Sequence, residues 1–197
     1  RGQITFTDSG FGINGVVGQA LGGETRVDGT LTGFADAAAQ SAGAAPKSAP
    51  GVLRLQGTAS AEGLRQANEL GTVATSLARY ASGATSYQAT VAMRAGVPEM
   101  VVSSSLSGLG LNLPPPFAKT AAAATPVRLE LGAARSGTGA ASAVLPGQSQ
   151  LRLDWGRLAS LALVTGGAGE SARVLRGALV VGAGAGDPLV LPERGIS

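Results

Sequence analysis

The sequence predicts a mostly β protein built on an antiparallel sheet, with one apolar face, one polar face and a single helix. Three observations support this prediction. Apolar and polar residues alternate with period two in many short runs, as expected for half-buried strands. Glycine-rich turn signals separate these runs at short intervals, and connections of this length join antiparallel strands. Only one segment carries apolar residues at helical spacing.

The predicted strands follow one another along the whole chain. In the first run Ile4 and Phe6 share one face, and in a central run Leu129 and Leu131 do so while Arg128 and Glu130 lie on the other. Because the alternation is one-sided, we expect the sheet to have one apolar and one polar face. The alternating runs are 3–7, 26–33, 53–59, 87–94, 100–106, 127–131 and 151–154. Two later runs, 158–164 and 173–181, are more uniformly apolar, which is typical of strands covered on both faces.

The predicted helix spans residues 62–82. Apolar residues recur there at helical spacing, Ser60 precedes the segment as a possible N-cap, and Gly83 follows it as a possible C-terminal cap residue. Gly71 inside the segment lowers its helix propensity by about 1 kcal/mol. The apolar positions are Leu64, Ala67, Leu70, Ala74, Leu77 and Ala78.

Two segments are predicted to lie outside the sheet ladder. Residues 35–50 are rich in Ala, Ser and Pro, and we expect a flexible loop there. The three prolines at 114–116 follow a segment, 106–113, that we predict to be extended. Because proline lacks the N–H group and disfavours helix in the residue before it, we expect these prolines to lead the chain out of the sheet. We otherwise treat residues 1–197 as a single segment.

The amino-acid composition excludes several kinds of catalytic and metal-binding site. The chain has no His and no Cys, which removes Ser-His-Asp and Cys-His catalysis, zinc sites built on these residues, and disulfides. The aspartates lie at strand ends and turns, where this residue is common. We therefore predict no enzymatic activity, no catalytic residue, no metal site and no cofactor.

A nucleic-acid partner is not expected either. The net charge is +3 with 14% charged residues, the arginines are dispersed, and there are only four Phe, two Tyr and one Trp. Too few aromatic rings are present to stack on a series of bases. No stretch approaches 18 uninterrupted apolar residues, so we predict no membrane-spanning helix within this chain.

One region resembles a known family. The residues Ser105-Leu106-Ser107-Gly108-Leu109-Gly110-Leu111-Asn112-Leu113-Pro114-Pro115-Pro116-Phe117-Ala118-Lys119, followed by Pro126-Val127-Arg128-Leu129, resemble a signature of the YhdP proteins, which are AsmA-like envelope proteins of Gram-negative bacteria. The similar part covers residues 70–131. Pro115 stands where the family pattern has Ala, and the loop 35–50 resembles an insertion.

The resemblance implies a location and a shape. Proteins of this family are anchored in the inner membrane and extend through the periplasm, so the anchor would lie outside this internal segment. Their extended, curved sheet shelters acyl chains on an apolar concave face, and members are implicated in carrying phospholipid toward the outer membrane. The implied partners are therefore a phospholipid or another acyl-chain lipid, together with envelope proteins.

The alternation supplies candidate lipid-binding residues on one face of the sheet. They are Leu53, Leu55, Tyr87, Val91, Met93, Leu129, Leu131, Leu151 and Leu153. The alternative is a structural or interaction β-domain of an envelope scaffold or adhesin, and a more remote one is an enzyme acting on polysaccharide. A continuous open trough favours lipid transport, a face closed by the helix favours the scaffold, and a cleft with two close carboxylates favours the enzyme.

Overall fold

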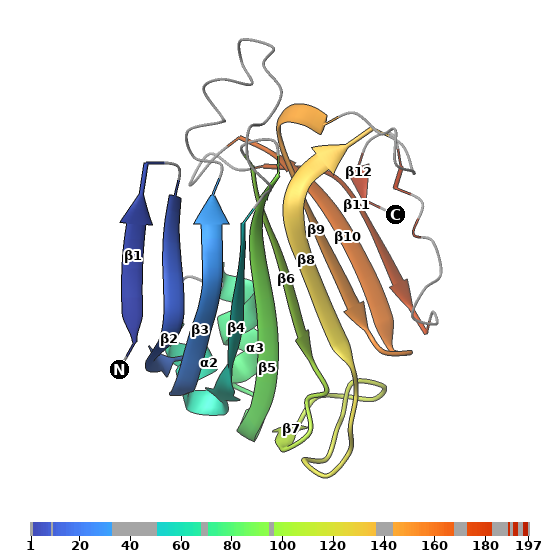
Figure 1. Cartoon of the computed structure of the whole chain (residues 1–197). Coiled ribbons are helices and arrows are strands. Elements are labelled where there is room, and N and C mark those ends of the chain that lie inside the picture. The colour runs from blue at the N-terminus through green and yellow to red at the C-terminus, as the bar shows by residue number, and fades with distance from the viewer. Residues whose placement is uncertain are drawn as a thin grey trace.

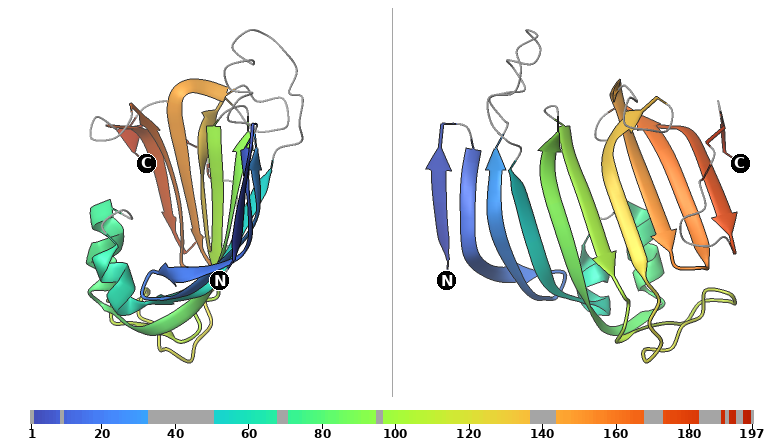
Figure 2. Two further views of the ribbon diagram at one scale, coloured as in Figure 1. Left: turned by 60° about the vertical axis from the view of Figure 1, so that its left-hand side comes forward. Right: turned by 45° about the vertical axis from the view of Figure 1, so that its right-hand side comes forward.

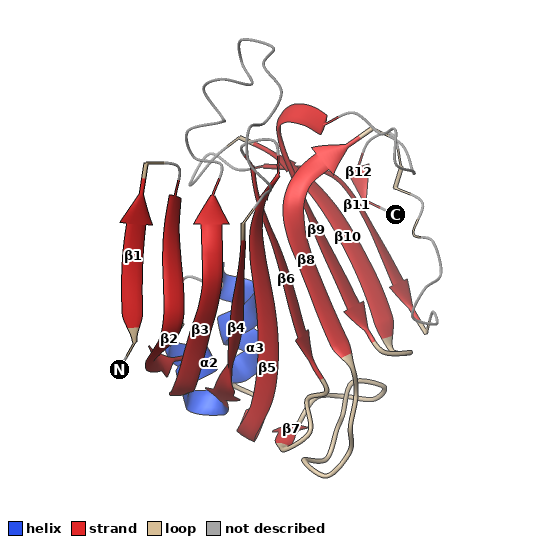
Figure 3. Cartoon of the chain, viewed as in Figure 1, coloured by secondary structure: helices blue, strands red, loops and turns tan. Residues whose placement is uncertain are grey.

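The computed structural model describes residues 2–8, 10–32, 51–67, 71–94, 97–136, 144–167, 173–182, 189, 191, 192, 195 and 196. These residues form one open sheet and two short helices (Figure 1, Figure 3). The predicted mostly β, antiparallel fold is therefore confirmed. The predicted loop at 35–50 lies outside the described residues.

The sheet is a meander in which chain order and spatial order coincide. Its strands, in both orders, are β1 (Gln3–Thr7), β2 (Gly10–Ala20), β3 (Gly23–Thr32), β4 (Val52–Ser60), β5 (Ala81–Arg94), β6 (Val97–Ser104), β8 (Val127–Arg135), β9 (Val144–Trp155), β10 (Ala159–Gly166), β11 (Arg173–Val181) and β12 (Gly195–Ile196). The short β7 (Leu109–Leu111) pairs separately with the first residues of β5. Each pairing is antiparallel except that of β11 with β12.

Strand β2 was not predicted, and its backbone gives the reason. Its register against β3 shifts between Ile13 and Val16, so β2 contains one residue more than its partner over this stretch. Gly15 lies there with a φ of +60°, a conformation that glycine adopts readily. The extra residue breaks the period-two alternation, and the sequence pattern therefore fails to indicate a strand.

The single predicted helix at 62–82 is wrong in its extent. The segment forms two helices, α2 (Ala61–Gln66) and α3 (Gly71–Ala78), and β5 begins at Ala81. Ser60 caps α2 as expected, because its Oγ accepts a hydrogen bond from the N–H of Gly63 at 3.0 Å. At Ala67 the backbone leaves helical geometry, with φ −79° and ψ 76°.

Gly83 is not a helix cap but a bend within β5. Its φ is +84°, and the strand changes partner there, from β7 at residues 81–83 to β4 from Ala84 onward. A Cβ at this position would lie 2.2 Å from the carbonyl oxygen of Gly108. Glycine is therefore required by both the backbone conformation and the close approach.

The segment around the prolines agrees with the prediction in part. Leu109–Leu111 is a strand, and the N–H of Phe117 donates to the carbonyl of Pro114 at 3.0 Å, so the prolines lead into a turn rather than a helix. The extended part is shorter than the predicted 106–113, because Leu106 and Gly108 have positive φ values of 50° and 89°.

Both helices lie on the same side of the sheet (Figure 2). The lower ends of β2 and β5, as seen in Figure 1, bend toward them and make this side concave. No helix within the described residues is long and apolar enough to cross a membrane.

The junction of α2 with the turn between β2 and β3 generates a prediction. Gly63→Ala in an ordinary helix would stabilise the fold by about 1 kcal/mol. Here a Cβ on Gly63 would lie 2.0 Å from the carbonyl carbon and oxygen of Leu21, so we expect a loss of about 2 kcal/mol in the free energy of unfolding. Denaturant titration followed by circular dichroism measures this change.

The matched control is Gly18→Ala in β2. A Cβ there meets no atom within 4 Å, so the free energy of unfolding should stay the same or rise slightly. Equal stability of the Gly63→Ala and Gly18→Ala variants would contradict the close packing of α2 against this turn.

Candidate functional site

The pairing register places all nine predicted site residues on one face of the sheet. Residues directly opposite each other on neighbouring strands point to the same face. One row across the sheet runs Leu53, Val91, Met100, Leu131, Leu151, Leu163. The next row runs Leu55, Ala89, Val102, Leu129, Leu153, Leu161. Tyr87 and Met93 follow the same alternation on β5. We call this side of the sheet the apolar face.

Part of the apolar face, on β3, β4 and β5, forms a closed cluster. Leu31, Leu53 and Met93 are buried, and the partly buried residues packed against them include Leu55 and Val91. Tyr87 belongs to the same half of the sheet, and its hydroxyl shares a hydrogen bond of 2.9 Å with Thr25 Oγ1. These side chains contribute to a core, and burying each large one stabilises the fold by about 1.5–3 kcal/mol.

The apolar face is more open on either side of this cluster. On β1, Ile4 and Phe6 lie on the same face by register and are 52% and 78% exposed. Leu129, Leu131, Leu151 and Leu153 are only half-buried. Beyond them on β11 Leu179 is 51% exposed and Val181 is 54% exposed, and the register places both on the same face. The expectation that the run 173–181 is covered on both faces is therefore wrong. Contiguous exposed apolar surface is uncommon on a soluble domain and often marks a site of interaction.

A pocket of about 210 Å³ lies where the helices meet the lower end of the apolar face. The sequence did not indicate this pocket, although the alternation of Leu109, Leu111 and Leu113 was a usable signal. Phe117 stacks on Trp155 beside it, with ring centroids 5.4 Å apart. We call it the end pocket, and its lining residues, all of them apolar or aromatic, are Leu64, Leu77, Ala78, Ala81, Leu106, Leu109, Leu111, Leu113, Val127, Leu153 and Trp155.

Lys119 holds the wall of the end pocket together. Its buried ammonium group donates to the carbonyl oxygens of Leu106 and Leu109, both at 2.7 Å, and of Thr120 at 3.1 Å. Leu111 and Lys119 also exchange backbone hydrogen bonds of 2.8 and 2.9 Å. Burial lowers the pKa of Lys119, while the three carbonyl oxygens favour its charged form. Sequence reasoning missed this role because it depends on how the loop folds back.

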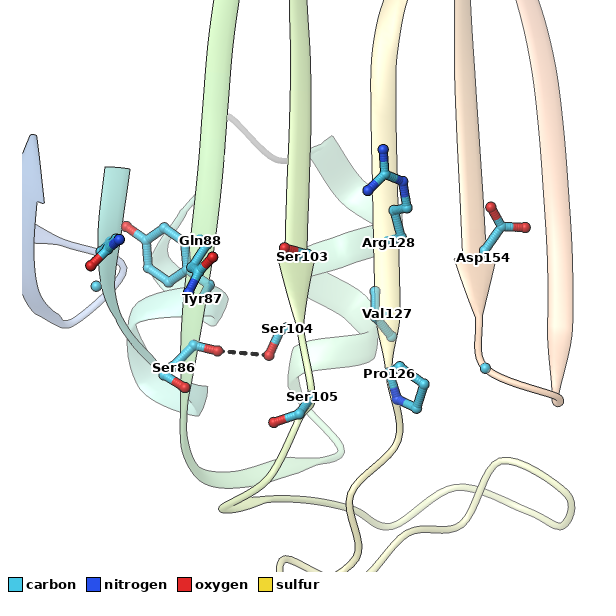
Figure 4. A pocket seen from close by; sticks show the side chains of 13 residues that line it. Ser86, Tyr87, Gln88, Ser103, Ser104, Ser105, Pro126, Val127, Arg128 and Asp154 are labelled. Carbon is cyan, nitrogen blue, oxygen red and sulfur yellow. Dashed lines mark hydrogen bonds between the residues drawn. The ribbon is translucent and has the colours of Figure 1, made fainter. Parts of the chain in front are cut away.

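The opposite face of the sheet is mostly polar from β4 to β9, whereas on β10 it buries Ala162 and Val164, which are 2% and 1% exposed. The register aligns Gln56, Gln88, Ser103, Arg128 and Asp154 in one row across five strands. This row lies along a shallow groove of about 690 Å³ (Figure 4).

The chemistry of this polar groove is that of a hydrated surface. The hydroxyl of Ser104 donates to the carbonyl of Ser86 at 2.7 Å, and the exposed pair of Arg128 with Glu130 contributes little to stability. Asp154 is the single acidic residue along the groove, whereas glycoside hydrolysis requires two close carboxylates. Among the residues that the structure describes, no cluster of three or more His, Cys, Asp or Glu side chains is placed to hold a metal ion.

Comparisons with protein-family models, with curated proteins and with solved structures find no match to this chain.

Lys119 provides a test of how the end pocket is built. In Lys119→Met the buried carbonyl oxygen of Leu109 loses the Lys119 donor, whereas the carbonyl oxygens of Leu106 and Thr120 keep the backbone N–H groups of Leu109 and Ala123, both at 3.2 Å. An unsatisfied buried acceptor carries a desolvation cost of about 1–3 kcal/mol, so we expect the free energy of unfolding to fall by about 2 kcal/mol, as measured by chemical denaturation. Arg54→Met, at an exposed position on the polar face, should stay within about 0.5 kcal/mol of the unmodified chain. Equal stability of the two variants would show that Lys119 does not hold the loop.

Proposed function

We propose that this chain is a non-enzymatic segment of a periplasm-spanning lipid-transport protein, and that its apolar face shelters phospholipid acyl chains between the inner and outer membranes. The observation that carries the proposal is the pairing of half-buried leucines across β8, β9 and β10 on an open, concave sheet. This face continues into the exposed Leu179 and Val181 of β11. A closed globular domain would bury such a row.

The energetics of acyl binding suit this surface. Each methylene group removed from water contributes about 0.8 kcal/mol, so an acyl chain needs no polar partner. The half-buried positions Leu129, Leu131, Leu151 and Leu153 are the lipid-contacting residues in the proposal. The other predicted residues support the sheet in and beside the closed cluster of the same face; they are Leu53, Leu55, Tyr87, Val91 and Met93.

The envelope setting of the proposal rests on the resemblance of residues 105–119 and 126–129 to the YhdP signature. That resemblance supports a location in the periplasm of a Gram-negative bacterium and an anchor in the inner membrane outside this segment. The open apolar face is consistent with such a role, because it provides a surface for acyl chains away from either membrane.

A second candidate function has two observations in its favour. Both helices lie over the lower end of the apolar face, where they line the end pocket together with β8 and β9, and a face covered by a helix favours the scaffold. The closed cluster of Leu31, Leu53 and Met93 gives part of the face an ordinary core, as expected for a structural or interaction β-domain of an envelope scaffold or adhesin. The half-buried leucines of β8 and β9 are harder to reconcile with that alternative, because a scaffold domain gains stability by burying them.

The distinguishing experiment is Leu131→Asp. If the face is open, the carboxylate reaches water, so the melting temperature should fall by only a few degrees while crosslinking to a photoactivatable phospholipid drops at least tenfold. If the face is a closed core, the buried charge costs several kcal/mol and the domain unfolds. Thermal melting and lipid photo-crosslinking in cells measure the two effects.

Thr90→Asp is the matched control. Thr90 is exposed on the polar face of β5, so this variant adds the same charge without touching the apolar face and should retain crosslinking. A collapsed melting temperature for Leu131→Asp, together with no lipid adduct on the unmodified protein, would reject the lipid-transport function in favour of the scaffold.

A further inference from the structure

A second pocket lies at the lower rim of the sheet, near the strand ends that line the end pocket. It is a groove of about 640 Å³, formed by the loop from Pro116 to Pro126 and the turn between β9 and β10, and we call it the rim groove. The chain passes directly from one lining to the other at two places, from Pro126 to Val127 and from Trp155 to Gly156. The rim groove shares Pro126 and Gly156 with the groove of the polar face and no lining residue with the end pocket. A ligand whose acyl chain lies in the end pocket would therefore have to cross the rim of the sheet at these strand ends to place its other end in the rim groove.

The rim groove carries positive charge without a balancing acid. Its charged lining residues are Lys119 and Arg157, and no carboxylate lines it. The three carbonyl oxygens around Lys119 Nζ satisfy its hydrogens but leave its net charge unneutralised, because no carboxylate of the described residues forms an ion pair with it. A buried charge of this kind is weakly screened and acts on any group that enters the groove.

Arg157 is the group placed to contact an anion. Its side chain is exposed in the turn after Trp155, and within the described part of the chain it makes no hydrogen bond or ion pair. Arg65, by contrast, is bound to Glu62 and to the carbonyls of Ala78 and Ala81. A free guanidinium beside a buried ammonium favours phosphate, to which it can donate two parallel hydrogen bonds.

We propose that the rim groove binds the phosphate of an anionic lipid headgroup while the end pocket takes part of the acyl chain of the same molecule. This inference rests on the proposed lipid-transport function and specifies its substrate class. Arg157 contacts the phosphate in this arrangement. Lys119 lines the rim groove and adds its positive charge there, and its hydrogen bonds to Leu106 and Leu109 hold two residues of the end pocket in place. The hydroxyls of Thr120 and Thr125, which also line the groove, add further donors.

Trp155 supplies a built-in probe for the test. It is the one tryptophan in the sequence, and it lines the end pocket, so acyl chains carrying bromine should quench its fluorescence when they bind there. Two lipids with identical brominated chains are compared, phosphatidylglycerol and uncharged diacylglycerol. Each is titrated into the unmodified chain and into Arg157→Gln, at low salt.

The expected result distinguishes binding of the lipid headgroup from binding of the acyl chains. Arg157→Gln should weaken phosphatidylglycerol binding about tenfold and leave diacylglycerol binding unchanged, because it removes a charge-assisted contact and nothing apolar. Arg54→Gln removes the same charge on the polar face and should change neither affinity. Both variants should melt at the temperature of the unmodified chain, since both side chains are exposed.

Other outcomes overturn the proposal in distinguishable ways. If the two lipids quench equally and Arg157→Gln affects neither, the rim groove binds no headgroup, but the lipid-transport function stands. If neither lipid quenches Trp155, acyl binding in the end pocket fails, and the proposed function with it. If calorimetry shows binding of inorganic phosphate that depends on Arg157, while the lipids show no headgroup preference, the groove is a site for free phosphate and not for lipid.

Discussion

The register of the antiparallel ladder is the constraint on which the rest of this structure depends. From β4 to β10 each strand pairs with the next so that apolar residues face apolar residues, and the row from Leu53 to Leu163 is continuous. A slip of one residue in a single pairing would send the apolar side chains of that strand to the polar face. One-sided burial therefore specifies the register, and the register in turn creates the apolar face on which the proposed function rests.

The lower end of the sheet departs from this regularity, and the departures form the pockets. Gly83 bends β5 and lets it pair with β7, and Gly108 faces it with a second positive φ. Lys119 then holds the returning loop through three carbonyl oxygens. An ordinary core would be closed here by large apolar residues. Instead, the chain is held by backbone bends and by one buried cation, Lys119, and two pockets remain open, the apolar end pocket and the cationic rim groove.

The closed and open parts of the apolar face have different physical roles. In the cluster on β3, β4 and β5 large side chains meet and exclude water, so Leu53 and Met93 stabilise the fold. On β8 and β9 the leucines remain half-buried, and in the proposed function their exposed apolar area contributes to the binding of an acyl chain. In the proposed function this division keeps the sheet folded while an acyl chain enters and leaves.

The sequence by itself determined the fold class, most of the strands and which residues lie on the apolar face. Each of these depends on period-two alternation, which can be recognised from neighbouring residues in the sequence. It also located the capped start of α2 at Ser60, where the signal is again local. Only the tertiary structure decided that 62–82 forms two helices, that β2 is a strand despite its bulge, and that Gly83 is a bend. It alone brought Lys119 and Arg157 to one groove beside Trp155. These features depend on contacts between residues far apart in the chain, for which a periodic pattern carries no information.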